Sequence, residues 1–298
     1  MVTRKHVEFC LEQNLKNSAA AGKHNFIGKV SDLLEKANFT VHYRDAADYP
    51  NGYALVHEQE PVSNQTLTLE RCYHPPFWTI EKTSDRWEWD VAKTPFRADK
   101  VEASQAKKFY SFWQGRLFGE AASQTAQDGY IYVPLQTNLS DRAPWQTCTP
   151  FEMLVSTLQY DPSRRILASL DPEVTYSSQD RSKLKTLVGR FPRLEVRSQT
   201  NQELLQRCDY VVTQNSAQAF DGYFFGKPCV LFARSDFHHI AGDVFTNGPE
   251  AAFKQVQGSP PPFAKYIWWF WQEMSINAGR DQAKNKIRKA LRRGGWPI

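Results

Sequence analysis

Short apolar segments alternate with amphipathic segments from about residue 129 onward. This spacing predicts strands alternating with helices, as in parallel sheets built from βαβ units with helices on both faces. The predicted strands are 130–135, 165–170, 194–197, 210–213 and 228–232, and the predicted helices are 151–160, 180–191, 202–208 and 216–225. We therefore expect an α/β chain with one Rossmann-like, doubly wound domain over residues 127–262.

The pattern is less regular in the first part of the chain. Residues 26–39 form an amphipathic repeat that Asn25 can cap, and residues 40–43 and 53–56 are apolar enough to be strands. Prolines and tryptophans interrupt residues 72–89, which we expect to be a long ordered loop. A second, smaller α/β domain over residues 1–126 fits this pattern best.

The last part of the chain, residues 263–298, has a helical pattern. An apolar and aromatic segment with the run Trp268–Trp271 precedes a segment that holds six Lys or Arg residues between Lys284 and Arg293. Two interpretations remain open: these helices pack across the domains, or they anchor the protein at an anionic membrane surface. No nucleic-acid recognition motif accompanies the basic run, so we expect no nucleic-acid partner.

Composition narrows the class of protein. With 298 residues, 41% hydrophobic and 23% charged, the chain is typical of a folded protein of two-domain size. No apolar run reaches the ~18 residues of a membrane span, and no apolar signal core follows Met1. The five cysteines are scattered without CxxC spacing, so we expect neither disulfides nor a cysteine zinc site. A cytoplasmic location follows from these features.

The strongest local motif lies between Asp209 and Phe232. It places Ser216 where a predicted strand ends and a helix begins, which is the edge at which parallel sheets bind ligands. The helix N-terminus favours an anion, and the hydroxyl adds a donor. Asp221 lies about one and a half turns further on and can accept hydrogen bonds from a ribose. The alternative is that Ser216 only caps the helix and Asp221 is a solvated helix residue.

This motif resembles the donor-nucleotide segment of GT-B glycosyltransferases, above all the bacterial capsular polysaccharide and Kdo-transferase type. In that family a strand leads into Asn-Ser, a helix with an acidic residue, Gly-Lys-Pro and a further strand. The resemblance implies two Rossmann-like domains facing a cleft, with C-terminal helices packing across them. It also implies transfer of a sugar from a nucleotide donor, often a CMP-linked acid sugar, to a glycan or lipid-linked acceptor. The implied donor-binding residues are Asn215, Ser216, Asp221 and Lys227.

A second segment, Val133 to Asp141, is similar to the strand-to-loop segment of the same family. The resemblance implies that Gln136 contacts the donor and that Asp141 is the general base for the acceptor hydroxyl. Alternatively, Asp141 is a turn residue or caps the segment at Pro144.

One position departs from the family pattern. Asp171-Pro172 stands where the family has His-Pro, and an aspartate repels phosphate. His238 or His239 can supply a positive partner instead. On a strand these two adjacent side chains would point to opposite faces, so a shared metal is not expected.

The resulting hypothesis is a GT-B-like glycosyltransferase that needs no metal or other cofactor beyond its nucleotide-sugar co-substrate. Two alternatives stay open: a nucleotide-sugar hydrolase or epimerase, and a non-catalytic nucleotide- or glycan-binding protein on a degenerate scaffold. Asp171 motivates the last of these. Residues 22–25 also precede a helix, but their Gly-Lys pair lacks the spacing of a phosphate loop.

Overall fold

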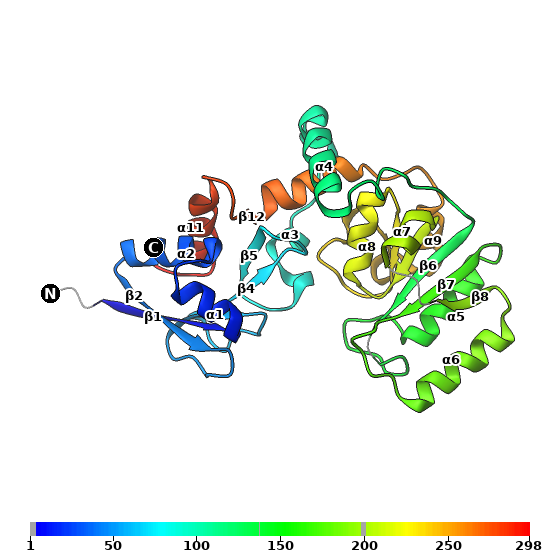
Figure 1. Ribbon diagram of the computed structural model, residues 1–298, viewed down its shortest axis with the longest axis horizontal. Helices are drawn as coiled ribbons and strands as arrows, with labels where there is room; N and C mark the ends of the chain where they lie inside the picture. The colour runs from blue at the N-terminus through cyan, green and yellow to red at the C-terminus, as the bar shows by residue number, and fades with distance from the viewer. Residues whose placement is uncertain (1–3, 137, 198–200) are drawn as a thin grey trace. The chain divides into compact units, whose positions relative to one another are not determined.

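The computed structural model describes residues 4–136, 138–197 and 201–298, which form two compact units. Unit 1 contains the chain up to Thr94 together with Trp269–Ile298, and unit 2 is Pro95–Trp268. Each unit is built on its own six-stranded sheet with helices packed against it (Figure 1). The expectation of two α/β domains with mostly parallel sheets is confirmed.

The sheet of unit 2 has the strand order β11-β10-β9-β6-β7-β8, and all its strand pairs are parallel. Its strands are β6 (Tyr130–Leu135), β7 (Arg165–Leu170), β8 (Leu194–Arg197), β9 (Tyr210–Thr213), β10 (Cys229–Leu231) and β11 (Gly242–Asp243). All six residues of β6 are buried, as expected for a central strand covered on both faces. The strand order reverses between β6 and β9, so this is a topological switch point of a doubly wound sheet.

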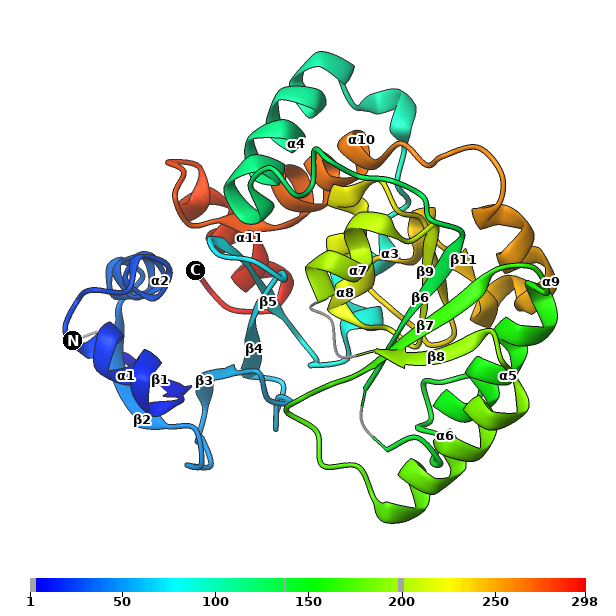
Figure 2. The ribbon, with the colours of Figure 1, turned by 45° about the vertical axis from the view of Figure 1, so that its right-hand side comes forward.

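Helices cover this sheet, as seen when the molecule is turned (Figure 2). They are α5 (Pro150–Tyr160), α6 (Ser178–Arg190), α7 (Asn201–Arg207), α8 (Ala217–Gly222) and α9 (Val244–Val256), with 3₁₀ turns η3 (Tyr223–Phe225) and η4 (His238–Ile240). Thr149 and Glu152 form a capping box at the start of α5, with Pro150 in the first turn. The predicted strands and helices of this region are found, except that the helix expected at 216–225 is divided into α8 and η3.

Unit 2 begins earlier than the sequence indicated. It includes η2 (Ala98–Lys100), α4 (Ala103–Phe118) and α10 (Phe263–Trp268), with α4 packed on α10. Tyr110 Oη donates to the Tyr223 carbonyl at 2.7 Å, and Gln114 Nε2 donates to the Phe224 carbonyl at 2.6 Å. These contacts hold α4 in unit 2, so the boundary lies after Thr94 and not after residue 126.

The sheet of unit 1 has the order β12-β5-β4-β3-β1-β2. Its strands β1 (Lys5–Leu11), β2 (Phe39–Asp45), β3 (Tyr53–His57) and β4 (Thr66–Arg71) pair in parallel, whereas β5 (Phe77–Glu81) pairs antiparallel with both β4 and β12 (Ile276–Asn277). Residues 72–89 were expected to be a loop, and that prediction was wrong because β5 lies within them.

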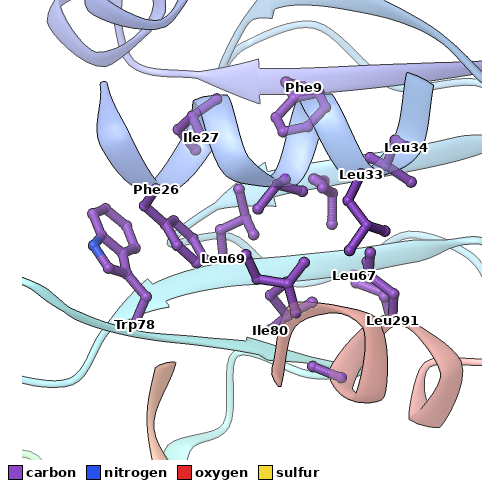
Figure 3. Close-up of a cluster of buried hydrophobic side chains, with 14 of the residues drawn as sticks. Phe9, Phe26, Ile27, Leu33, Leu34, Leu67, Leu69, Trp78, Ile80 and Leu291 are labelled. Carbon is purple, nitrogen blue, oxygen red and sulfur yellow. The ribbon is translucent and has the colours of Figure 1, made fainter. Parts of the chain in front are cut away.

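Helices complete unit 1: α1 (Gln13–Ala20), α2 (Asn25–Lys36), α3 (Asp90–Lys93) and α11 (Ala283–Arg293), with the 3₁₀ turn η1 (Arg86–Glu88) and the π-helix η5 (Trp269–Met274). Residue His24, not Asn25, caps α2. The apolar sides of α2 and α11 meet the sheet in one core, in which Phe26 stacks on Trp78 with ring centroids 4.8 Å apart (Figure 3).

Residues 263–298 do not form a separate domain. The aromatic run ends in the core of unit 1, where Trp271 is fully buried, stacks on Phe77 at 4.3 Å and donates from Nε1 to the Cys72 carbonyl. Trp269 and Phe270 are buried as well. Trp269, Phe270 and Trp271 are therefore packed inside the protein, and these three rings are not exposed to a membrane interface. Among the described residues, no helix has the length and apolar character needed to span a bilayer.

Candidate functional site

A cavity of about 270 Å³ lies at the carboxyl edge of the unit 2 sheet. Its walls come from the ends of β6 and β7 and from the first residues of α7 and α8, next to the switch point between β6 and β9. The polar residues that line it are Gln136, Ser169, Asp171, Asn201, Ser216 and Gln218. Sheets of this topology bind ligands at this position, so we take the cavity as the candidate site.

Ser216 lies where β9 passes into α8. Its hydroxyl oxygen accepts from the Gln218 N–H at 3.3 Å and so caps the helix. Because this hydroxyl already accepts a backbone bond, its own hydrogen remains to be donated to a ligand. The Ser216 N–H donates to Thr213 Oγ1, whose hydroxyl donates to the Pro134 carbonyl of β6. Ser216 is thus fixed to both strands of the switch point.

Tyr132 holds two of the cavity-lining residues in place. Its side chain is buried in β6, and its hydroxyl lies 2.9 Å from Ser169 Oγ and donates to Asn201 Oδ1 at 2.6 Å. Burial raises the pKa of this phenol, which keeps it protonated. Since the Asn201 carbonyl oxygen faces Tyr132, its amide group faces elsewhere as a donor. Sequence reasoning missed Tyr132, Ser169 and Asn201 as site residues, because only the β6–β7 pairing and the position of α7 bring them together.

Asp171 is the single charged side chain among the described residues that line the cavity. One of its carboxylate oxygens accepts from the Glu173 N–H at 2.9 Å, in the turn that follows β7. The carboxylate repels an anion and attracts a hydroxyl donor. The lining of the cavity therefore offers neutral donors from Ser216 and Asn201 and a charged acceptor from Asp171.

The other residues implied by the donor motif are spread around this edge. Asn215 donates from Nδ2 to the Arg234 carbonyl at 3.3 Å. Asp221 is half-buried in α8 and does not line the cavity, and neither does Asp141, which is exposed and accepts a hydrogen bond from the Asn138 amide. Of the implied set, the structure brings only Gln136 and Ser216 to the cavity.

Lys227 lies at the opposite edge of the sheet, because it precedes β10 whereas Ser216 follows β9. Its side chain is buried, and its ammonium group donates to the Ala126 carbonyl at 2.6 Å. Desolvation lowers its pKa. The donor-binding role implied for Lys227 therefore does not agree with its position, which is that of a structural residue.

His238 and His239 lie on the 3₁₀ turn η4 and not on a strand. Their rings stack with centroids 4.2 Å apart, so the expectation of opposite directions was wrong. His238 Nδ1 bonds the Ser235 carbonyl at 2.8 Å, and His239 Nδ1 lies 3.0 Å from Tyr266 Oη. Neither histidine lines the cavity. Within the described ranges, no three His, Cys, Asp or Glu side chains come together as a metal site.

The chain has only low similarity to known proteins, in sequence and in structure. No protein-family model and no curated protein sequence matches the chain. Among solved structures it is similar to KpsC β-Kdo 2,4-transferase of Thermosulfurimonas dismutans, with 13% identity over 88% of this chain and 89% of that chain and a TM-score of 0.48. The β-Kdo 2,7-transferase of the same protein gives 13% identity, coverage of 78% and 80%, and a TM-score of 0.47.

A UDP-GlcNAc 2-epimerase from Neisseria meningitidis, solved with UDP-GlcNAc, has 11% identity over 97% of this chain and all of that chain (100%), with a TM-score of 0.36. At these values the similarity assigns no activity to the chain. The function must therefore be argued from its own residues.

Proposed function

We propose that this chain is an enzyme of the GT-B type that uses a nucleotide sugar and transfers the sugar to an acceptor hydroxyl. The observation that carries the proposal is the cavity at the switch point of unit 2, with Ser216 fixed between β6 and β9. The resemblance of residues 209–232 to a donor-nucleotide motif supports it.

Each side of the cavity has a role in this proposal. Ser216 Oγ and the amides of Asn201 and Gln136 donate to the donor phosphate, which lets neutral groups stabilise the leaving phosphate. Asp171 accepts from a hydroxyl of the ribose or of the sugar. A carboxylate would repel a phosphate but can accept a hydrogen bond from a hydroxyl. In this proposal Asp171, and not Asp221, is the carboxylate that binds the ribose or sugar hydroxyl.

We further propose which classes of donor and acceptor this enzyme uses. The motif favours a CMP-linked acid sugar as donor and a glycan or lipid-linked acceptor of capsule or lipopolysaccharide synthesis. The exposed basic side chains Arg288, Lys289 and Arg292 of α11 support contact with an anionic inner-membrane surface.

Asp141 is the proton acceptor that the resemblance implies. If it has that role, Asp141→Asn lowers turnover while the dissociation constant of the nucleotide stays as in the wild type.

Nucleotide binding tests the proposal. We would measure dissociation constants for CMP, CDP, UDP, GDP and ADP by calorimetry, for the wild type and three variants. Ser216→Ala should weaken binding about 10- to 100-fold, as expected for one hydrogen bond to a charged group worth ~1.5–3 kcal/mol. Ser216→Asp keeps a capping side chain but adds a negative charge to the cavity, so it should abolish nucleotide binding.

Lys227→Met is the matched control, because the structure places this side chain at the far edge of the sheet. It should leave the dissociation constant unchanged. Binding of CMP alone would favour the acid-sugar donor, and binding of a diphosphate nucleotide would change the donor class. Failure of all five nucleotides to bind would contradict the proposed function and favour a non-catalytic protein.

A further inference from the structure

The end of β7 carries two polar side chains on the same face of the unit 2 sheet. Ser169 is the last residue but one of this strand and Asp171 directly follows it, so the two are separated by one residue and share a face. Both line the cavity at the switch point. Along an extended chain their Cα atoms are about 7 Å apart, a spacing that two neighbouring hydroxyl groups of a ligand can bridge.

The backbone of Asp171 is fixed to the end of β6. Its N–H donates to Tyr176 Oη at 3.0 Å, and that hydroxyl donates to the Leu135 carbonyl at 2.9 Å. One carboxylate oxygen accepts from the Glu173 N–H, which uses one of the roughly four lone-pair positions of a carboxylate. The side chain is therefore held at the cavity with further capacity to accept hydrogen bonds.

Tyr132 sets the direction of two hydrogen bonds beside this carboxylate. A phenol has one hydrogen, and Tyr132 donates it to Asn201 Oδ1 at 2.6 Å. The 2.9 Å contact between the Tyr132 and Ser169 hydroxyls is then a bond in which Ser169 donates. Because Ser169 uses its hydrogen in this bond, it can offer a ligand only lone pairs. Asn201, whose carbonyl oxygen accepts from Tyr132, can offer its amide hydrogens.

Burial preserves these directions. Tyr132 has no exposed surface. Burial raises the pKa of its phenol, and the negative charge of Asp171 acts in the same direction. The phenol therefore keeps its hydrogen near neutral pH, and neither hydrogen bond reverses.

The cavity thus combines two kinds of polar group. The two acceptors, Ser169 and Asp171, come from the end of β7, whereas the donors Asn201 and Ser216 come from the starts of α7 and α8. Donors suit a phosphate, and a pair of acceptors suits two hydroxyls. Strand β7 is the second strand of this sheet in chain order, and in Rossmann-type sheets an acidic residue at the end of the second strand hydrogen-bonds a ribose hydroxyl of the nucleotide.

We propose that Ser169 and Asp171 bind the two ribose hydroxyls of the nucleotide, and that Tyr132 is a positioning residue that keeps Ser169 an acceptor and Asn201 a donor. This role rests on the proposed function. It makes ribonucleotides, and not deoxyribonucleotides, the ligand class of the cavity, and it needs only residues of unit 2.

Removal of single ribose hydroxyls tests this subsite. We would measure dissociation constants by calorimetry for the nucleotide that binds in the panel and for its 2′-deoxy and 3′-deoxy forms. In the wild type, loss of the hydroxyl that meets Asp171 should weaken binding about 10- to 100-fold, and loss of the hydroxyl that meets Ser169 about 2- to 10-fold. Asp171→Asn keeps a neutral acceptor, so it should reduce the first ratio to about 2- to 10-fold. Ser169→Ala should abolish the second ratio.

Tyr132→Phe tests the positioning role, because it removes the hydroxyl and keeps the ring in the core. The Ser169 hydroxyl and the Asn201 amide can then rotate, so the constants of all three ligands should rise and the ratio that depends on Ser169 should fall towards 1. A purely structural loss would weaken the three ligands equally and leave the ratios unchanged. Tyr130→Phe is the matched control, since this hydroxyl of the same strand donates to the Leu204 carbonyl and does not line the cavity.

Glu173→Gln is the matched control for Asp171→Asn. It removes an exposed carboxylate from the same turn, and both ratios should stay at their wild-type values. Equal binding of the ribose and deoxyribose forms by the wild type, or wild-type ratios in Asp171→Asn and Tyr132→Phe, would overturn this inference while nucleotide binding upholds the proposed function. Absence of nucleotide binding in the wild type would instead refute both.

Discussion

Two histidines of unit 1 are packed against the same tryptophan. The ring centroids of His24 and His57 lie 5.5 and 6.0 Å from that of Trp78. His24 Nδ1 accepts from the Ile27 N–H at the start of α2, which requires this nitrogen to be unprotonated. Burial is the largest cause of the lowered pKa of both histidines, and the charge of Arg71 acts in the same direction. The folded state therefore favours their neutral forms.

This preference makes the stability of unit 1 depend on pH. The folded-state pKa of each histidine lies below its unfolded value of ~6.5, so below that pH the unfolded state binds more protons. The free energy of unfolding should therefore be highest above about pH 6.5. It should decrease as the pH falls through the folded-state pKa values of the two histidines. Urea unfolding at pH 7.5 and 5.5 measures this. The double variant His24→Gln/His57→Gln should show a smaller difference, and a wild type that is more stable at pH 5.5 would contradict the assignment.

At the residue scale, sequence reasoning found site residues only where one motif contains them. Gln136 could be placed at this edge because it directly follows the predicted strand 130–135, and Ser216 because it lies three residues after the predicted strand 210–213. The sequence motif wrongly placed Lys227 at the donor site together with Ser216. Helix α8 lies between these two residues and returns the chain to the amino ends of the strands, so Lys227 lies far from the cavity. Tyr132 and Ser169 could not be predicted, because their side chains meet only through strand pairing.

At the scale of elements, the contact between β11 and α9 depends on a glycine. A Cβ atom on Gly242 would lie 2.4 Å from the Ala252 carbonyl oxygen, closer than van der Waals contact allows. Both partners are backbone, so neither can move without displacing its element. The last strand of the unit 2 sheet therefore requires glycine at this position.

Gly242→Ala should destabilise unit 2 by several kcal/mol or prevent its folding, as overpacking and backbone displacement do. Gly115→Ala in α4 is the matched control, because its Cβ would meet nothing within 4 Å. There a helical alanine should stabilise the protein by about 0.5–1 kcal/mol. Thermal unfolding of both variants gives the comparison, and a Gly242→Ala protein with the wild-type Tm would show that the contact is not as tight as described.

Strands β6 to β10 of unit 2 could be predicted because each is a short segment with apolar residues beside a predicted helix. Other strands were missed because they lack such a local signal. Strand β12 has two residues and exists only through pairing with β5, and β11 is equally short. Strand β5 lies among prolines and tryptophans that are typical of loops, and its partner β4 determines its conformation.

At the scale of the whole molecule, unit 1 is assembled from two distant parts of the chain. Ile287 and Leu291 of α11 contribute to its core, and β12 pairs with the edge of β5. Arg293 forms ion pairs with Glu81 and Asp90. Glu81 is a buried carboxylate whose pKa burial raises and Arg293 lowers, so it needs this partner.

We expect a chain ending at Trp268 to retain a folded unit 2 and to lose the folded unit 1. Removing one partner of a buried ion pair costs ~3–5 kcal/mol, and the core loses apolar side chains in addition. Proton NMR of this chain should show dispersed signals for unit 2 only. Adding residues 269–298 as a separate peptide should restore signals of unit 1, and a fully dispersed spectrum without the peptide would contradict the prediction.

The division of unit 1 has a consequence for synthesis on the ribosome. The first part of this unit is made early, but α11 appears only after the whole of unit 2 has been translated. At ~5–20 residues per second, this delay is on the order of 10–40 s. During that time the nascent chain carries the open edge of β5 and the apolar surface that α11 later covers. We therefore expect the N-terminal part to be a client of chaperones that hold hydrophobic nascent segments, whereas unit 2 can fold as soon as it leaves the exit tunnel.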